Sequence, residues 1–164
     1  MPSFHVAQLN IGRIVAPLDS EQLAGFVEAL EPVNAVADRA PGFVWRLQTD
    51  EGDATAIRPY GDDMILVNMS VWESVEALVA FVFSGSHREL LRSRRQWFER
   101  HVEPYAVLWW VPAGHRPDVA EAKQRLERLL RDGPTPEAFT FRTTFGPPDA
   151  ARDAPHVDPG VLCR

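Results

Sequence analysis

The sequence contains a single cysteine, Cys163, so it can form neither an internal disulfide nor a cysteine-based metal site. It has no apolar run long enough for a membrane-spanning helix. It also lacks a glycine-rich phosphate loop, a histidine–glutamate zinc motif and a nucleophile elbow. Residues 1–11 lack the basic and long apolar regions of a secretory signal. We therefore expect a cytoplasmic protein that binds no membrane and no metal.

Lysine is almost absent as well, because Lys123 is the only one and arginine supplies the remaining positive charge. The net charge of −6 argues against a nucleic-acid partner, since such proteins present a basic surface. One segment departs from this acidic character through Arg88, Arg92, Arg94, Arg95 and Arg100. These arginines fit either a solvated helix face balanced by neighbouring glutamates or a surface that binds anions.

The apolar content is sufficient for one folded core. The chain has 164 residues, of which 45% are hydrophobic and 24% charged, as in an ordinary globular domain. We expect a single domain over residues 1–148, whose last part hooks back onto the domain. The tail over residues 149–164 has little to bury and is predicted to be disordered.

The strand and helix patterns follow the order β-α-β-β-α-(α)-β-α. Strands are predicted at 4–11, 43–49, 64–72 and 106–111, and helices after Asp19, Ser74 and Asp118 and from His87. This order predicts an α+β fold, a ferredoxin-like split βαβ unit with a four-stranded antiparallel sheet. Helices should cover one face of the sheet, leaving an open apolar face that a second copy would bury. We therefore expect a homodimer.

The segment from His87 to His101 carries polar residues on its apolar stripe. His87, Arg94 and His101 recur every seven residues beside Leu90 and Leu91, on the side of a helix that faces the core. Burying such groups is costly unless they find partners or line a solvated cavity. The spacing therefore predicts a polar pocket inside the domain.

The third predicted strand has an apolar face and a second face that carries polar and aromatic side chains. The second face is expected to line the pocket together with amides of the first strand and tryptophans of the second and fourth. Aromatic walls with a few polar anchors are typical of small-molecule sites, although the tryptophans could equally be core and the amides could bond within the sheet. The candidate substrate-binding residues are Gln8, Asn10, Trp45, Asn68, Ser70, Trp72 and Trp110.

Several short segments carry signatures of a known family, at 5–10 (HVAQLN), 42–47 (GFVWRL), 67–73 (VNMSVWE), 86–87, 97–98, 109–115 and 133–139. Together they resemble a bacterial family of unknown function in the dimeric α+β barrel superfamily, over residues 3 to 148. The resemblance implies that fold. The superfamily includes cofactor-free quinone-forming monooxygenases, polyketide cyclases, haem-degrading and haem-dependent enzymes, and small stress proteins. In its monooxygenase-like branch a histidine often follows the second helix, and His87 occupies the comparable place.

Three functions follow as hypotheses, and they leave open whether the protein is an enzyme. In the first, an aromatic or polyketide-like molecule undergoes cofactor-independent oxidation or cyclisation, with His87 as the acid–base group. Arg94 would set the electrostatics of that histidine, or pair with Glu73 or Glu103. In the second, His87 is an axial haem ligand and Arg94 suits the propionates. In the third, the protein binds a small ligand or acts in stress without catalysis, and His87 only bonds the backbone.

Overall fold

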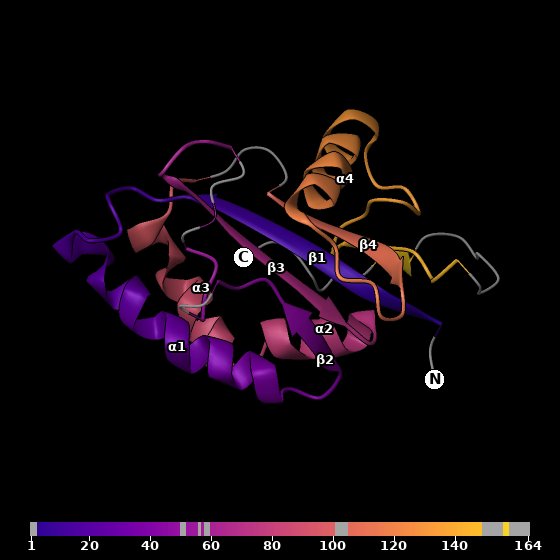
Figure 1. Cartoon of the computed structure of the whole chain (residues 1–164), viewed down its shortest axis with the longest axis horizontal. Helices are drawn as coiled ribbons and strands as arrows, with labels where there is room; N and C mark the ends of the chain where they lie inside the picture. Colours follow the sequence, from indigo (N-terminus) through magenta and orange to yellow (C-terminus); the bar gives the residue numbers. More distant parts are fainter. Residues whose placement is uncertain are drawn as a thin grey trace.

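The computed structural model describes residues 3–49, 52–55, 57, 60–100, 105–148 and 156–157, without the side chains of 86, 87, 90, 91, 156 and 157. The chain folds into one main sheet flanked by helices (Figure 1). Its elements are β1 (Phe4–Arg13), η1 (Glu21–Leu23), α1 (Ala24–Arg39), β2 (Phe43–Arg46), β3 (Ile65–Trp72), α2 (Val75–Val82), α3 (Gly85–Trp97), β4 (Ala106–Pro112), α4 (Val119–Asp132), β5 (Thr143–Thr144) and β6 (His156–Val157).

The main sheet has four strands in the order β2-β3-β1-β4, and every neighbouring pair is antiparallel. This order confirms the predicted ferredoxin-like split βαβ unit, in which the first and third strands occupy the centre. The register places Gln8 opposite Ser70 and Asn10 opposite Asn68. Because side chains alternate between the two faces of a sheet, these four side chains share one face.

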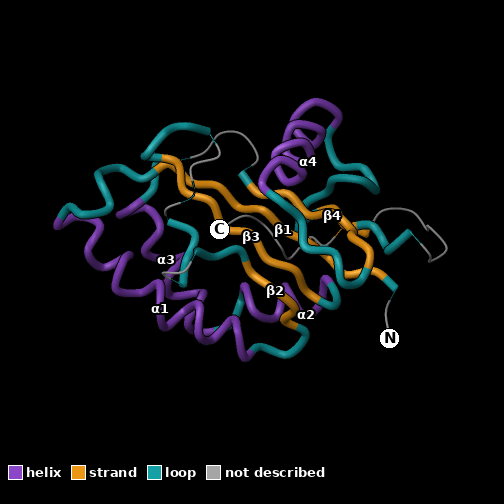
Figure 2. The backbone as a smooth tube through the Cα atoms, in the orientation of Figure 1, coloured by secondary structure: helices purple, strands orange, loops and turns teal. Residues whose placement is uncertain are grey.

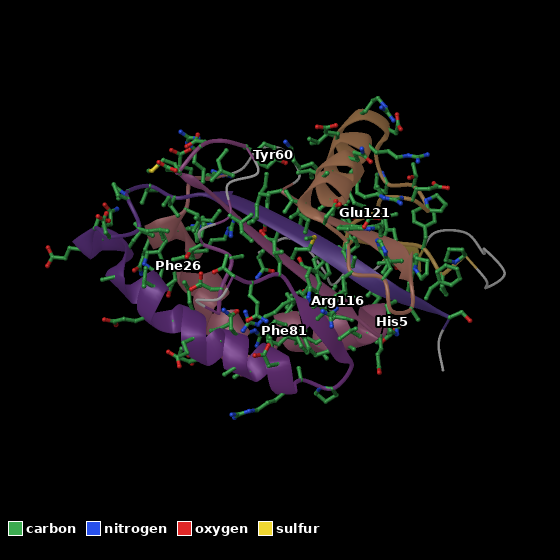
Figure 3. All side chains as sticks on the ribbon, viewed as in Figure 1. His5, Phe26, Tyr60, Phe81, Arg116 and Glu121 are labelled. Carbon is green, nitrogen blue, oxygen red and sulfur yellow. The ribbon has the colours of Figure 1, made fainter. Side chains whose placement is uncertain are left out.

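Helices α1, α2 and α3 lie on one side of the sheet and α4 lies on the other (Figure 2). The side covered by α1, α2 and α3, called the α1–α3 face, carries two separate apolar clusters. One surrounds Trp72 and Leu78 under α2, and the other surrounds Phe26 and Trp97 where α1 meets α3. Phe81 belongs to the first cluster and Phe26 to the second, and Figure 3 shows them apart from each other on this side of the sheet. The polar residues of β1 and β3 fall between the clusters.

The other side of the sheet, called the α4 face, is not open as predicted. Its strand residues, which include Leu9, Met69 and Trp109, are buried against Leu126 and Leu129 of α4 in one continuous apolar cluster. The sequence pattern predicted this helix but not the sheet face on which it packs, because an amphipathic helix after the last strand can pack on either side of a sheet. The apolar face therefore needs no second copy to be buried, and the homodimer remains a prediction without this support.

The segment after α4 returns to the sheet. Leu108 of β4 and Phe139 exchange two backbone hydrogen bonds of 2.8 Å, and the Phe139 side chain is fully buried. Beyond residue 148 the described residues form β6, which pairs with β5. The rest of the tail predicted to be disordered lies outside the described residues.

The helices begin with different capping chemistry. Ser74 precedes α2 and accepts a hydrogen bond from the backbone N–H of Ala77 at 3.1 Å, and Asp118 precedes α4 and accepts one from Glu121 at 2.8 Å. Ser84 precedes α3 but makes no such bond. No helix in the described part of the chain is long and apolar enough to cross a membrane.

Candidate functional site

Polar side chains of β1 and β3 form a hydrogen-bonded chain on the α1–α3 face. Gln8 Nε2 donates to Asn68 Oδ1 at 2.7 Å and to Ser70 Oγ at 2.9 Å, and Trp72 Nε1 donates to Ser70 Oγ at 2.8 Å. We call these four residues the polar centre. Gln8 and Ser70 are only 6% and 7% exposed, so their hydrogen bonds hold them in fixed orientations.

Asn68 is the exposed end of the polar centre, although the residues before and after it in β3, Val67 and Met69, are buried. Its Oδ1 accepts the bond from Gln8, whereas its Nδ2 has no hydrogen-bond partner among the residues the structure describes. Asn10 lies directly opposite and is half-buried, and its side chain likewise makes no hydrogen bond to a described residue. Directly opposed residues have Cβ atoms about 5 Å apart. The two amides are therefore placed to bind one molecule together.

Trp72 is the buried end of the polar centre. Its side chain is 1% exposed and packs against Phe43 and Phe81, with ring centroids 5.4 and 5.1 Å away. A side chain enclosed to this degree has no surface left for a substrate. Trp72 therefore orients Ser70 through its indole N–H and does not form a wall in contact with the ligand.

The Arg94 guanidinium lies further along the same face, over Gly12. Its Cζ is 4.7 Å from the ring centroid of Phe98 and 4.6 Å from that of Tyr105, in a double cation–π arrangement. A Cβ at Gly12 would lie 3.3 Å from Arg94 Nη2. Gly12 is two residues from Asn10, or about 7 Å along the strand. The cation thus lies near the side-chain amides of Asn10 and Asn68.

Arg94 Nη2 is buried and has no hydrogen-bond partner in the described part of the chain. Burial lowers the pKa of the Arg94 guanidinium, and Tyr105 acts in the opposite direction, but an arginine remains charged. Of the predicted carboxylate partners, Glu103 lies outside the described residues, and Glu73 lies beside Gly42 near α2. Among the described residues, two aromatic rings rather than a carboxylate surround this cation.

Trp45 lies on the opposite face of the sheet from the other candidate substrate-binding residues. The sequence pattern placed Phe43, Trp45 and Leu47 on one strand face, but the pairing of β2 with β3 shifts register between Phe43 and Trp45. This irregularity leaves Phe43 on the α1–α3 face and turns Trp45 and Leu47 into the apolar cluster of the α4 face. The proposed substrate contact of Trp45 is therefore inconsistent with its position.

Trp110 lies on the α1–α3 face but away from Asn68. It pairs with Val6 in the register, and its Nε1 donates to the backbone oxygen of Phe145 at 2.8 Å. Its ring lies beside Phe139, with centroids 6.4 Å apart. Trp110 thus fastens the returning C-terminal segment to the sheet.

The candidate base is only partly placed. His87 lies in the first turn of α3, but its side chain is outside the described residues, as is the whole of His101. In the described part of the chain no three His, Cys, Asp or Glu side chains cluster in a way that would hold a metal ion.

A cavity of about 660 Å³ opens elsewhere, between the end of α1 and α2. Sequence reasoning missed it, although the small residues that create it are visible as Ala40, Gly42, Ala77 and Ala80. The remaining lining residues are Val36, Arg39, Pro41, Glu73, Phe81 and Ser84. The cavity is separated from the polar centre by the stacked rings of Phe81 and Trp72.

Several solved structures are similar in fold. One is a conserved protein from Methanosarcina mazei Go1, with 10% identity, a TM-score of 0.46, and coverage of 67% of this chain and 93% of that one. Another, from Nitrosomonas europaea, is proposed to be an antibiotic biosynthesis monooxygenase, with 12% identity, a TM-score of 0.44, and coverage of 72% and 97%. A third is SnoaB, a cofactor-independent oxygenase from Streptomyces nogalater, with 17% identity, a TM-score of 0.42, and coverage of 70% and 96%. Likeness at this level carries nothing about activity.

No curated protein matches the chain closely enough to be a relative. A family match, in contrast, extends over residues 5–155, which is nearly the whole sequence. It confirms the membership in a family of unknown function that the short signatures predicted. The chain belongs to the family described as "Domain of unknown function (DUF3291)".

Proposed function

We propose that the protein binds a small aromatic or polyketide-like molecule at the polar centre and catalyses its cofactor-independent oxidation or cyclisation. The observation that carries this proposal is the exposed Asn68 amide, held by Gln8 between the two buried apolar clusters of the α1–α3 face. Asn10 and the Arg94 guanidinium add donors along the same face. Oriented donors in a partly desolvated site are suited to stabilise a developing anion.

Oxidation and cyclisation share a first step that these residues suit. A phenol, or a carbon acid next to a carbonyl group, loses a proton and becomes a delocalised anion. The amide N–H groups of Asn68 and Asn10 and the guanidinium of Arg94 would stabilise the negative oxygen. The proton would pass to His87, a role that rests on the sequence. Ser70 and Trp72 would act as positioning residues, because they hold Gln8 and through it Asn68.

In the oxidative branch the second reactant is dioxygen. One oxygen atom replaces a ring hydrogen and becomes a new carbonyl oxygen. The second oxygen atom leaves as water with the hydrogens of the ring C–H and of the phenol O–H. The substrate loses four electrons and dioxygen gains four, so no further reductant is required. In the cyclising branch the anionic carbon attacks a carbonyl carbon of the same molecule, and water is lost.

The stabilisation of the anion can be tested without the natural substrate. We expect 4-nitrophenol to bind preferentially as its yellow phenolate, so the apparent pKa of the bound probe falls below that of the free probe. In Arg94→Met, which keeps the apolar stem, phenolate affinity should fall about 10- to 100-fold, the range of a charge-assisted hydrogen bond. The measurement is a spectrophotometric titration. Equal phenolate affinity in the parent and in Arg94→Met would contradict the proposal.

The described residues of the two sites give little support to the haem alternative, because they supply no usual axial ligand. The polar centre offers amides, a hydroxyl and an indole, and the cavity beside α2 is lined by no histidine, cysteine, tyrosine or methionine. None of these described groups is a usual axial ligand, and the side chain of His87, the predicted ligand, lies outside the described residues, so we derive no step through haem. We expect one equivalent of haemin to give no sharp Soret band with the purified protein. A band that is lost in His87→Ala would refute the cofactor-free proposal and favour haem chemistry.

A non-catalytic ligand carrier is the remaining alternative. It would bind phenolates as described but leave oxygen-sensitive phenols unchanged, so dioxygen uptake separates it from an enzyme. The homodimer and the cytoplasmic location predicted from the sequence accompany the proposal, but the chemistry at the polar centre depends on neither.

A further inference from the structure

Three exposed arginines form a row along α3. Arg88, Arg92 and Arg95 are four and three residues apart, so their side chains lie on one side of the helix. None of them forms an ion pair with a described residue. Glu99, just beyond the helix, pairs with Arg13 at 3.6 Å and not with the row. This arginine row therefore presents positive charge on the outer side of α3.

The neighbouring helix α1 carries the opposite charge on its outer side. Glu28 and Glu31 are exposed and three residues apart, so they share one side of the helix. Neither forms an ion pair with a described residue, in contrast to Asp38, which pairs with Arg46 at 2.8 Å. We call Glu28 and Glu31 the acidic pair. Two neighbouring helices thus present exposed charges of opposite sign.

Helices α1 and α3 lie side by side and run in opposite directions (Figure 1). Gly25 near the start of α1 lies against Trp97 at the end of α3, where a Cβ on the glycine would be 3.4 Å from Trp97 Cζ2. At the other end, Ala40 after α1 and Phe81 of α2, the helix before α3, line the same cavity. The contact between Gly25 and Trp97 therefore sets a common level from which positions along both helices are measured.

The acidic pair and the arginine row lie at matching distances from this level. An α-helix rises about 1.5 Å per residue, which places Glu28 about 4.5 Å and Glu31 about 9 Å along α1. On α3, Arg95 lies about 3 Å and Arg92 about 7.5 Å from the same level. Glu28 is therefore level with Arg95, and Glu31 with Arg92. Within one molecule they stay apart, because the axes of packed helices are about 8–10 Å apart and these side chains are exposed.

A second copy of the chain complements both sets of charges at once. Rotation by 180° about an axis that runs between and parallel to the two helices places α1 of one copy on α3 of the other, with every level unchanged. Glu28 of each copy then meets the partner's Arg95, and Glu31 meets the partner's Arg92. A flat anionic surface such as a membrane would instead meet the acidic pair together with the arginine row, and like charges repel. We infer that the outer sides of α1 and α3 form a symmetric interface between two copies of this chain.

This interface differs from the one expected from the sequence, in which a second copy covers an open face of the sheet. Helix α4 covers that face, so the two copies associate through helices on the other side. The contacts are charged and exposed, and exposed ion pairs each contribute little. The dimer is therefore weak and sensitive to salt, which screens such charges.

Charge reversal on each side of the interface tests the inference by sedimentation equilibrium of the whole chain. We expect the parent to dimerise with a Kd of about 10–100 µM in low salt, and at least about tenfold more weakly in 0.5 M salt. Arg92→Glu and Glu31→Arg each oppose like charges at both symmetric contacts, so each should weaken dimerisation at least about tenfold. An equal mixture of the two variants should restore the dimer, because the heterodimer again joins opposite charges.

Arg116→Glu is the matched control, since it makes the same change in net charge at an exposed position of the loop before α4 (Figure 3). It should dimerise like the parent, and the circular dichroism of all variants should match, because every changed side chain is exposed. A monomeric parent in low salt, a dimer that survives both single reversals, a mixture that stays monomeric, or an equal loss in Arg116→Glu would overturn the inference. Binding of a monomeric parent to phosphatidylserine vesicles, lost in Arg92→Glu, would assign the arginine row to an anionic surface instead.

Discussion

Replacing Asn68 with alanine is expected to lower turnover of an oxygen-sensitive phenol by about 10²- to 10³-fold, as is typical when one donor to a developing oxyanion is removed. Asn68 Nδ2 is the exposed amide donor of the polar centre, and Gln8 fixes its orientation through a bond of 2.7 Å to Oδ1. The loss should appear mainly in kcat, because the donor acts on charge that forms during reaction. The measurement is dioxygen uptake with dithranol, a phenolic anthrone.

The fold should survive this change, because Asn68 is exposed and Gln8 keeps its bond to Ser70. Gln124→Ala is the matched control, since it removes an exposed amide from α4 on the other side of the sheet. It should leave dioxygen uptake unchanged. If Asn68→Ala consumes dioxygen at the parent rate, with one molecule taken up for each phenol oxidised, the amide is not part of the reaction.

The order of elements could be predicted because each one carries a local pattern. Alternating side chains marked β1 and β3, and Ser74 and Asp118 stand where their side chains cap α2 and α4. The side of the sheet that α4 covers could not be predicted in this way. An amphipathic helix shows which of its own faces is apolar, but not which of two apolar sheet faces will receive it.

The candidate site was predictable to the extent that alternation along a strand holds. Gln8, Asn10, Asn68 and Ser70 share a face because β1 and β3 run without a register shift. Trp45 was misplaced by an irregularity in β2, which changes the face of every later residue in the strand. No sequence pattern distinguishes such a shift from regular alternation in so short a strand.

The surroundings of Arg94 depend on contacts between distant segments. Phe98 follows α3, Tyr105 precedes β4 and Gly12 lies in β1, and they meet only in the folded chain. The helical stripe correctly placed Arg94 on the inner side of α3, but it did not indicate that aromatic rings would surround the cation. Gly12 is the residue that makes room for this arrangement.

Replacing Gly12 with alanine is expected to destabilise the protein by about 1–3 kcal/mol, the usual cost of overpacking a core. A Cβ at this position would lie 2.5 and 2.7 Å from two carbons of the Phe98 ring. That ring cannot easily move, because Phe98 packs edge-on against Phe26 at 5.2 Å and its backbone bridges Ile14. Thermal unfolding should show a decrease of about 2–4 °C in Tm for each kcal/mol lost.

The sign of this effect is informative, because backbone entropy alone favours alanine over glycine by about 0.4–1 kcal/mol. Gly85→Ala shows that contribution separately, since nothing lies within 4 Å of a Cβ at Gly85 and it begins α3. Its Tm should rise slightly while that of Gly12→Ala falls. Gly12→Ala should also weaken 4-nitrophenolate binding, because the new methyl group displaces the Arg94 guanidinium together with Phe98. A stable Gly12→Ala protein with parent phenolate affinity would show that neither the ring nor the cation is held against this strand.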